Sequence, residues 1–293
     1  MRLITRTRRQ SAGRPLGIRD IAPESVLVLA GGRAILLQLA NPAVGHGVAR
    51  HSDFASRPLD RLHGTLGYVY AVTCGTATDR AAAVQRVSAA HRPVHGPAVP
   101  ATADSAGSVR YNAFDPDLQL WVAATLYESA TRMHDLVLGP LADVDADAVY
   151  RDYAVLGTAL QVPADRWPAD RAAFARYWNE RLAGLSTDAT TRGVADQLLH
   201  PRTGPLGLRL LMPTARLITT GLLDPRERAL FGLAWSPARQ ARFDRLLWVV
   251  RTVYPRLPRV VRHAVMHRYL RSARAQARRE VDARGGRRQR GAS

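Results

Sequence analysis

The chain contains no lysine. All 42 of its basic side chains are arginine, against 24 acidic ones, and the formal net charge is +18. The absence of lysine excludes a lysine that forms a Schiff base, acts as a general base or ligates a metal. The positive excess raises the question of whether nucleic acid or an anionic membrane is a partner.

Cysteine and long apolar runs are also scarce. Cys74 is the single cysteine, so no disulfide can form within the chain, and a reducing cytoplasm is the expected compartment. No run approaches the roughly 18 apolar residues of a membrane span. The N-terminus has arginines but no apolar segment of a secretory signal. We therefore expect a cytoplasmic protein that is soluble or lies peripherally at the inner face of the membrane.

Several familiar catalytic motifs are missing. The chain has no glycine-rich dinucleotide turn, no P-loop, no GxSxG sequence and no HExxH zinc pair. The Glu-x-x-His signature of di-iron bundles is absent as well. Between residues 30 and 200 the only glutamates are Glu128 and Glu180, so a carboxylate-rich metal site is not expected.

The positive charge is concentrated at the two ends of the chain. Residues 1–19 carry six arginines and no acid, and residues 251–293 carry a net charge of +11, which leaves +1 for residues 20–250. This distribution argues against a basic groove across the protein and therefore against a specific nucleic-acid partner. The ends are either solvated termini or contacts for phosphates or lipid headgroups, and residues 251–293 are the segment proposed for peripheral membrane contact.

The dominant hydrophobic period is helical, and strand alternation of useful length is absent. Asn41 followed by Pro42 is typical of a helix start, as are Pro58 and Thr78, whereas residues 97–112 are expected to form a loop. We predict one all-α domain. The predicted division is a basic N-terminal arm over 1–19, a helical domain over 20–255, a basic amphipathic helix over 256–284 and a disordered tail over 285–293.

Histidine is the most informative residue type for chemistry. His91 follows Val84 and Val87 at helical spacing and so lies on the apolar face of its helix, and His95 lies one turn further on. Such a histidine is either a hydrogen-bonded core residue or an axial ligand of haem iron, which needs an uncharged imidazole in an apolar pocket. The pair could instead bind a divalent metal, although a third ligand is not evident.

Arg61 and Thr65 share one face of the preceding predicted helix. An arginine at such a position is either a solvated surface residue or an inward guanidinium that, beside a hydroxyl, holds a carboxylate or an oxygen species. Trp121 is typical of a core aromatic residue. Glu128 lies in an apolar helix and needs a partner if it is buried, whereas His134 is expected to be exposed.

Several stretches, taken in order, resemble one bacterial oxygenase family. These stretches are RAILLQLANPAVGHGVARHSDF (33–54), RLHGTLGYVYAVTCGT (61–76), AAHRPVHG (89–96), FDPDLQLWVAATLYESA (114–130), VLGTALQVP (155–163) and LITTGLLDPRERALFGLAW (217–235). The chain resembles the family of the MpaB-type enzymes and the rubber oxygenase, or latex-clearing protein, over residues 24–262.

The resemblance implies an all-helical fold with a globin-like core, a b-type haem with its iron, and cleavage of carbon–carbon double bonds in apolar substrates by O₂. It implies that His91 is the proximal haem ligand, with His95 as the alternative, and that Arg61 and Thr65 lie beside the haem as catalytic and cofactor-binding residues. Trp121 is placed with them among the cofactor-binding residues. The distal lysine of rubber oxygenases falls on Gly64 here.

Two functions follow from these observations. The first is a haem b-dependent oxygenase that acts with O₂ on an apolar small molecule, isoprenoid or lipid-like in character. The second is a non-catalytic helical protein that binds haem or a membrane surface, the latter through residues 251–293.

Overall fold

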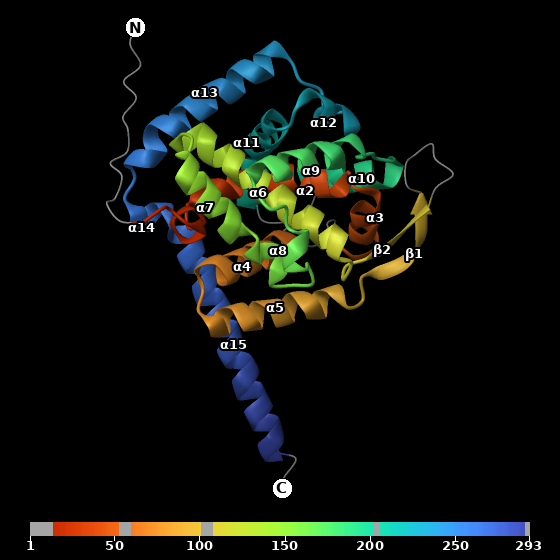
Figure 1. The fold of residues 1–293 in the computed structure, drawn as a ribbon, viewed down its shortest axis with the longest axis vertical. Coiled ribbons are helices and arrows are strands. Elements are labelled where there is room, and N and C mark those ends of the chain that lie inside the picture. Colours follow the sequence, from red (N-terminus) through yellow and green to blue (C-terminus); the bar gives the residue numbers. More distant parts are fainter. Residues whose placement is uncertain (1–13, 53–59, 101–107, 202–205, 291–293) are drawn as a thin grey trace.

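The structure is a computed structural model that describes residues 14–52, 60–100, 108–201 and 206–290. Figure 1 shows its elements in chain order. The elements are α1 (Ile18–Ile21), η1 (Ser25–Ala30), α2 (Gly31–Leu39), α3 (Pro42–His51), α4 (Asp60–Cys74), α5 (Ala77–His91), β1 (His95–Pro100), β2 (Ser108–Asn112), α6 (Pro116–Leu138), α7 (Asp143–Tyr153), α8 (Val155–Thr158), η2 (Ala164–Arg166), α9 (Arg171–Ala183), α10 (Ala189–Leu199), α11 (Leu206–Leu222), α12 (Pro225–Leu230), α13 (Pro237–Val253), η3 (Tyr254–Arg256), α14 (Arg259–Arg262) and α15 (Ala264–Arg290).

The prediction of an all-α protein is confirmed, because the described residues form helices apart from one two-stranded sheet. The globin-like arrangement of the core stays a prediction. The predicted N-terminal arm lies largely outside the described residues, as does the helix start at Pro58.

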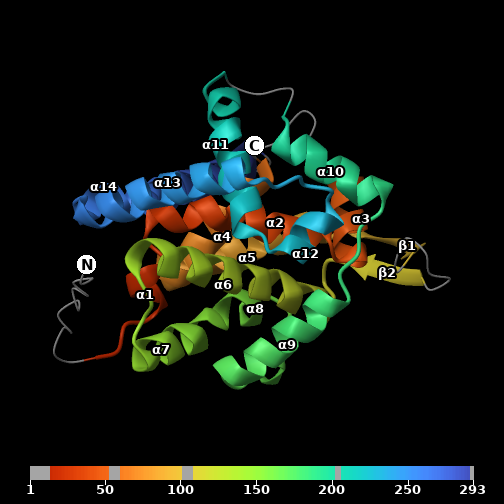
Figure 2. The ribbon, with the colours of Figure 1, turned by 90° about the horizontal axis from the view of Figure 1, so that it is seen from above.

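Helix α6 lies at the centre of the fold and is packed by α2, by η1 and by α13. The side chain of Asp115 begins α6 by accepting a hydrogen bond from Asp117 N at 2.8 Å, and Pro116 occupies the first turn. Gly139, at φ 89°, ends the helix in a conformation that favours glycine. Figure 2 shows α6 between α2 on one side and α7 on the other.

The C-terminal segment is docked on the body rather than free along its whole length. Met266 and Leu270 of α15 are buried in the main core, and α15 packs against α4 and α5. The predicted single helix over 256–284 is divided into η3, α14 and α15. Helix α15 also runs on to Arg290, so residues 285–290 are helical where the sequence predicts a tail; arginine and glutamine, which make up the other four of these residues, are good helix formers.

A buried ion pair joins the two ends of the described chain. Glu24 accepts a hydrogen bond from Arg262 Nε at 3.0 Å and another from the Tyr254 hydroxyl at 2.9 Å. Glu24 and Arg262 are 3% and 6% exposed. Because both charges are out of water, each depends on the other for compensation.

The hairpin and one helix differ from the sequence prediction. Strands β1 and β2 pair antiparallel, with Val99 opposite Val109, in a region where the sequence predicts a loop. Backbone hydrogen bonds between the two strands stabilise the hairpin. The prolines and glycines of this segment are typical of a loop, so its sequence does not indicate strands. Residues 101–107 of the predicted loop lie outside the described residues. Helix α5 begins after Thr76 rather than Thr78, because Thr76 and Asp79 form a capping box.

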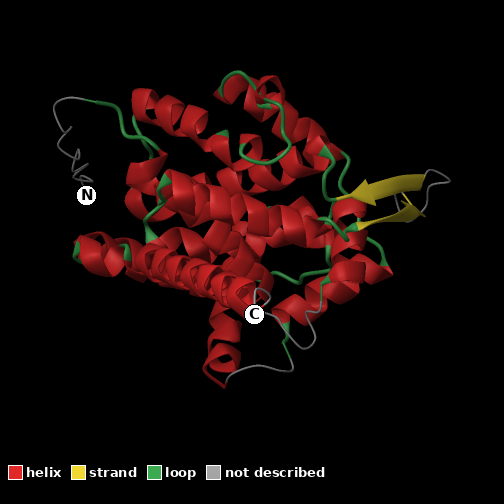
Figure 3. Cartoon of the chain, turned by 90° about the horizontal axis from the view of Figure 1, so that it is seen from below, coloured by secondary structure: helices red, strands yellow, loops and turns green. Residues whose placement is uncertain are grey.

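Helix α11 was not predicted. It contains Pro213, which removes one backbone donor, and Gly207, which is a poor helix former. Its C-terminal half is nevertheless fixed by tertiary packing, since Ile218 and Leu222 are buried against α6 and α13 residues. Figure 3 shows α11 projecting from the body.

Among the described helices, none alone has the length and hydropathy to cross a membrane. One bent pair, Ser25–Leu39 with Pro42–His51 at an angle of 106°, meets the criterion by length and composition.

Candidate functional site

An apolar cavity of about 320 Å³ lies among η1, α2, α4, α6 and α11. Its walls are mostly aliphatic side chains from segments as distant in sequence as Ile18 and Thr219. Gln38, Arg61 and Thr65 are polar members of the lining, and Arg61 contacts Gln38; we call the part of the cavity at these three residues its polar end. The structure therefore brings together two of the predicted site residues and adds Gln38, which sequence reasoning missed.

At this polar end, Gln38 of α2 bonds one residue of α6 and one residue of α4. Its Nε2 donates to the Thr125 hydroxyl at 3.0 Å, and its Oε1 accepts from Arg61 Nη2 at 3.4 Å. Gln38 is 4% exposed and stands among the fully buried residues of α2. The signal in the sequence was a lone amide within the apolar run AILLQLA, since a buried amide needs partners.

Arg61 is half-buried, and its guanidinium is incompletely satisfied. Its Nε is buried without a hydrogen-bond partner among the described residues. Burial lowers the pKa of the guanidinium to about 10, because desolvation disfavours the charged form. A buried cationic fork with a free donor at the end of an apolar cavity is suited to an anionic or oxygen-bearing ligand.

His91 is the last residue of α5, and α5 packs against the helix that carries Arg61. Its Nδ1 is buried and has no hydrogen-bond partner within the described part of the chain. Burial lowers the pKa of the imidazole, and the positive charge of Arg61 lowers it further. The ring of Phe114 meets the imidazole edge-on with centroids 6.2 Å apart. His91 does not line the cavity. Arg61, which does, is close enough for its charge to act on the imidazole.

His95 differs from His91 in its surroundings. It is exposed, and it begins β1 opposite Asn112 rather than ending a packed helix. The two histidines therefore lie in different elements, and only His91 has the apolar, half-buried environment that the sequence predicts for a ligand.

Trp121 lies behind the cavity instead of on its lining. It is 1% exposed, its Nε1 donates to the carbonyl of Leu37 at 3.3 Å, and it stacks on Trp178 with centroids 5.3 Å apart. The expectation of a core aromatic is confirmed. Among the described residues its indole nitrogen is already satisfied by backbone, so any effect of Trp121 on the site acts through the position of Leu37.

A fully buried arginine fixes α6 beside the cavity. Arg33 pairs with Glu128, and with Glu227 at 3.1 Å, and it donates to the Ser129 hydroxyl at 3.1 Å. Glu128 therefore has the partner that its place in an apolar helix requires. Ser129 also lines the cavity, so this ion network holds one wall in place.

His134 contradicts the sequence prediction of an exposed side chain. It is 2% exposed, and neither ring nitrogen has a hydrogen-bond partner among the described residues, although Nδ1 lies 3.6 Å from Asp135 Oδ1. Helix α6 is buried on most of its circumference, so its polar positions lie inside as well. Across the described residues, no group of three His, Cys, Asp or Glu side chains could hold a metal ion.

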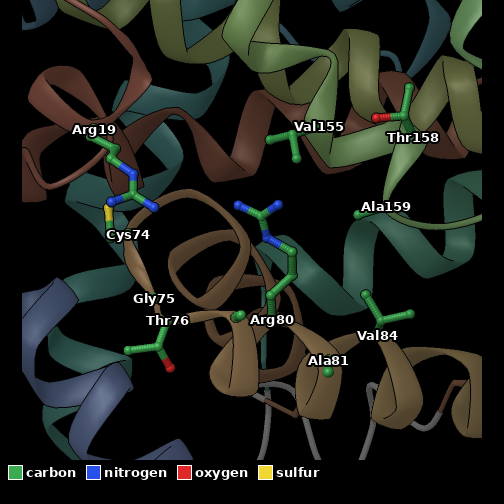
Figure 4. A pocket seen from close by; sticks show the side chains of 11 residues that line it. Arg19, Cys74, Gly75, Thr76, Arg80, Ala81, Val84, Val155, Thr158 and Ala159 are labelled. Carbon is green, nitrogen blue, oxygen red and sulfur yellow. The ribbon is translucent and has the colours of Figure 1, made fainter.

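A second, more open pocket of about 700 Å³ lies among α1, the turn between α4 and α5, α5 itself and α8 (Figure 4). Arg19 and Arg80 reach into it, and the Cys74 thiol lies beside Arg19. Burial raises the pKa of this thiol, so it stays protonated at neutral pH. The pocket contains none of the predicted site residues, and the apolar cavity is therefore the candidate site.

Comparison with known protein families shows which family the chain belongs to. The family model "ER-bound oxygenase mpaB/B'/Rubber oxygenase, catalytic domain" matches residues 18–252. The chain belongs to this oxygenase family. The resemblance stated from the sequence motifs is thereby confirmed, and the family supports an oxidoreductase that uses a small-molecule substrate and O₂.

Two mycobacterial proteins are similar to the chain over most of its length. They are the uncharacterized protein Mb2261 of Mycobacterium bovis and the uncharacterized protein Rv2237 of Mycobacterium tuberculosis. Each is 41% identical over 249 residues, which is 83% of this chain and 95% of the relative. No solved structure matches the chain.

Proposed function

We propose that the protein is a haem b-dependent oxygenase that acts with O₂ on an apolar, isoprenoid or lipid-like small molecule. The observation that carries the proposal is an apolar cavity with Arg61 and Thr65 in its lining, together with His91 on the packed neighbouring helix, where burial and the charge of Arg61 lower the imidazole pKa. Membership of an oxygenase family supplies the reaction class. The cytoplasm is the compartment we propose, on the single cysteine.

The residues present fit a haem group. Haem iron takes a single neutral imidazole on its proximal side, and the lowered pKa of His91 keeps that ring uncharged at physiological pH. A buried nitrogen without a partner is rare in folded proteins, and a bound group would satisfy it. His95 is exposed and offers no such pocket, which favours His91 as the ligand.

Haem, when bound, supplies the activation of O₂. Arg61 offers a forked donor for a carboxylate of the cofactor, and the same charge favours a polar oxygen atom at this end of the cavity. Gln38 orients the guanidinium by accepting from Nη2. The Thr65 hydroxyl, on the same face of α4, is a neutral donor that can orient the substrate or oxygen.

The cavity walls determine the substrate class in this proposal. An aliphatic lining excludes water from the reacting bond and binds apolar ligands by burial of their surface. The missing lysine, replaced by Gly64, leaves Arg61 and Thr65 as the groups that would control oxygen chemistry.

The absorption spectrum of the purified protein tests the proposal. A haem oxygenase shows a Soret band and a b-type pyridine haemochrome. The variant His91→Ala should lose both, whereas the matched variant His95→Ala, changed at the exposed histidine, should keep them. Full haem occupancy in His91→Ala would contradict the ligand assignment. A colourless protein that takes up no added haem would favour the alternative of a non-catalytic protein that binds a membrane surface.

A further inference from the structure

The exposed half of α11 carries a set of leucines that no other described element covers. Leu206, Leu210 and Leu211 are 69%, 72% and 67% exposed. Leu206 and Leu210 are one helical turn apart, and Leu211 adjoins them. Figures 2 and 3 show this helix standing out from the body. Large apolar side chains gathered on a projecting element mark an interaction surface.

The same helix forms a wall of the candidate site at its base. Met212, Ala215, Ile218 and Thr219 line the apolar cavity. The leucines at the start of the helix are exposed, whereas Ile218 and Thr219 near its end are buried. Helix α11 therefore connects an apolar outer tip with the interior of the cavity.

Two leucines of the cavity lining are also partly exposed at the surface. Leu29 and Leu62, which both line the cavity, are also 39% and 37% exposed. An apolar ligand that entered between these two leucines would meet apolar side chains on its way into the cavity. Pro201, which directly precedes the segment leading into α11, is a lining residue as well.

The charge of the segment indicates what the leucines contact. Residues 197–223 contain Arg202, Arg209 and Arg216 and not a single Asp or Glu. Arg209 is exposed between the leucines. Apolar side chains interspersed with arginine, without acidic residues, are typical of a helix that inserts its tip among anionic lipid headgroups.

We propose that α11 docks the protein on an anionic lipid surface through Leu206, Leu210 and Leu211, and that apolar ligands enter the cavity from the lipid. The proposed docking surface depends only on the exposed leucines and on the arginines of the same segment. The ligand route rests on the proposed function. The contact is distinct from the C-terminal residues 251–293, whose buried Met266 and Leu270 fasten α15 to the body.

Co-sedimentation with vesicles tests the docking surface. The cofactor-free protein should bind vesicles of phosphatidylcholine with phosphatidylglycerol and should bind pure phosphatidylcholine vesicles weakly. The double variant Leu210→Ser, Leu211→Ser should lose at least about tenfold in affinity, because two exposed leucines no longer enter the lipid. The matched control is Val144→Ser, which changes a side chain 57% exposed on α7, on the opposite side of the body (Figure 2).

Further outcomes and one control keep the test decisive. Equal binding of the double variant and the wild type would overturn the proposal, as would loss of binding on truncation after Arg278 with no effect of the leucine changes. Leucines that hold a second copy of the chain instead would appear as a dimer that the double variant dissociates in sedimentation velocity. Unchanged thermal unfolding shows that the variant is folded. A colourless protein that still binds vesicles through α11 would contradict the proposed function alone.

Discussion

Arg61 and Gln38 form a hydrogen bond between α4 and α2 at the polar end of the cavity, with Arg61 Nη2 3.4 Å from Gln38 Oε1. The bond is long, and the neighbouring Nε of the guanidinium has no partner in the described part of the structure. A half-buried cation held so loosely costs stability, and proteins keep such costs where function needs them.

The variant Arg61→Met is expected to separate stability from function. Without cofactor, its free energy of unfolding should equal that of the wild type or exceed it by up to about 1 kcal/mol, because a desolvated charge is removed. Haem occupancy should fall. Chemical unfolding of the cofactor-free protein and Soret absorbance measure the two effects. Arg61→Lys keeps the charge but loses the forked donor, and it should also bind haem less well. A large loss of stability in Arg61→Met would refute this view of Arg61.

The adjacent glycines Gly31 and Gly32 provide a matched pair for the contact between α2 and α11. A Cβ at Gly32 would lie 2.0 Å from Thr219 Oγ1, whereas one at Gly31 would meet its nearest neighbour, Leu62, at 3.9 Å. Gly32→Ala should therefore destabilise by about 1–3 kcal/mol through overpacking, and it should displace a wall of the cavity. Gly31→Ala should be neutral or stabilise by about 0.5–1 kcal/mol. Thermal unfolding of both variants checks the contrast, which equal effects would disprove.

Arg262→Ala tests the buried ion pair with Glu24. The substitution leaves the Glu24 carboxylate buried and uncompensated, and a loss of about 3–5 kcal/mol is expected. Arg259→Ala removes an exposed arginine from the same short helix and should change stability by less than about 0.5 kcal/mol. Guanidinium chloride unfolding distinguishes them. A small effect of Arg262→Ala would mean that water reaches Glu24.

The pH dependence of stability should reveal the contact between Asp79 of α5 and Arg274 of α15. Arg274 Nη2 lies 2.8 Å from the Asp79 carboxylate and is the main cause that lowers the pKa of Asp79 to about 2. A carboxyl whose pKa falls on folding stabilises the fold above its unfolded pKa, near 4, and this contribution disappears as the pH falls through 2.

Arg274→Gln should therefore lower stability at pH 6, and the gap to the wild type should shrink strongly near pH 2, where Asp79 is already about half protonated in the folded wild type. Urea unfolding at the two pH values measures the difference. Arg271→Gln, changed at an exposed arginine that bonds its own helix, is the control and should show no such pH-dependent gap. A gap that persists at low pH would assign the effect of Arg274 to packing instead.

Local signals predicted much of the fold. The Asn41–Pro42 start of α3 and the Asp115–Pro116 start of α6 each use a side-chain cap that the sequence displays. Helix α11 and the β1–β2 hairpin carry no such signal, because α11 is fixed by burial of Ile218 and Leu222 and the strands by each other. Secondary structure that is stabilised by residues distant in the sequence cannot be predicted from a short stretch of sequence.

The site was predictable only in part for the same reason. Helical spacing placed Arg61 with Thr65 and put His91 on an apolar face, and these residues do lie in adjacent helices. Gln38 was missed because its partner Thr125 is 87 positions away. The cavity itself has walls from both ends of the domain, and its existence follows from packing rather than from any motif.

The ion pair between Glu24 and Arg262 also bears on how the protein is made. Synthesis proceeds from the N-terminus, so Glu24 leaves the ribosome long before its partner exists. Until Arg262 emerges, the carboxylate must stay hydrated, and η1 cannot reach its final place beside the cavity. The ion pair that secures this part of the fold therefore forms only when nearly the whole chain has been made, and a nascent protein that stalls earlier lacks it.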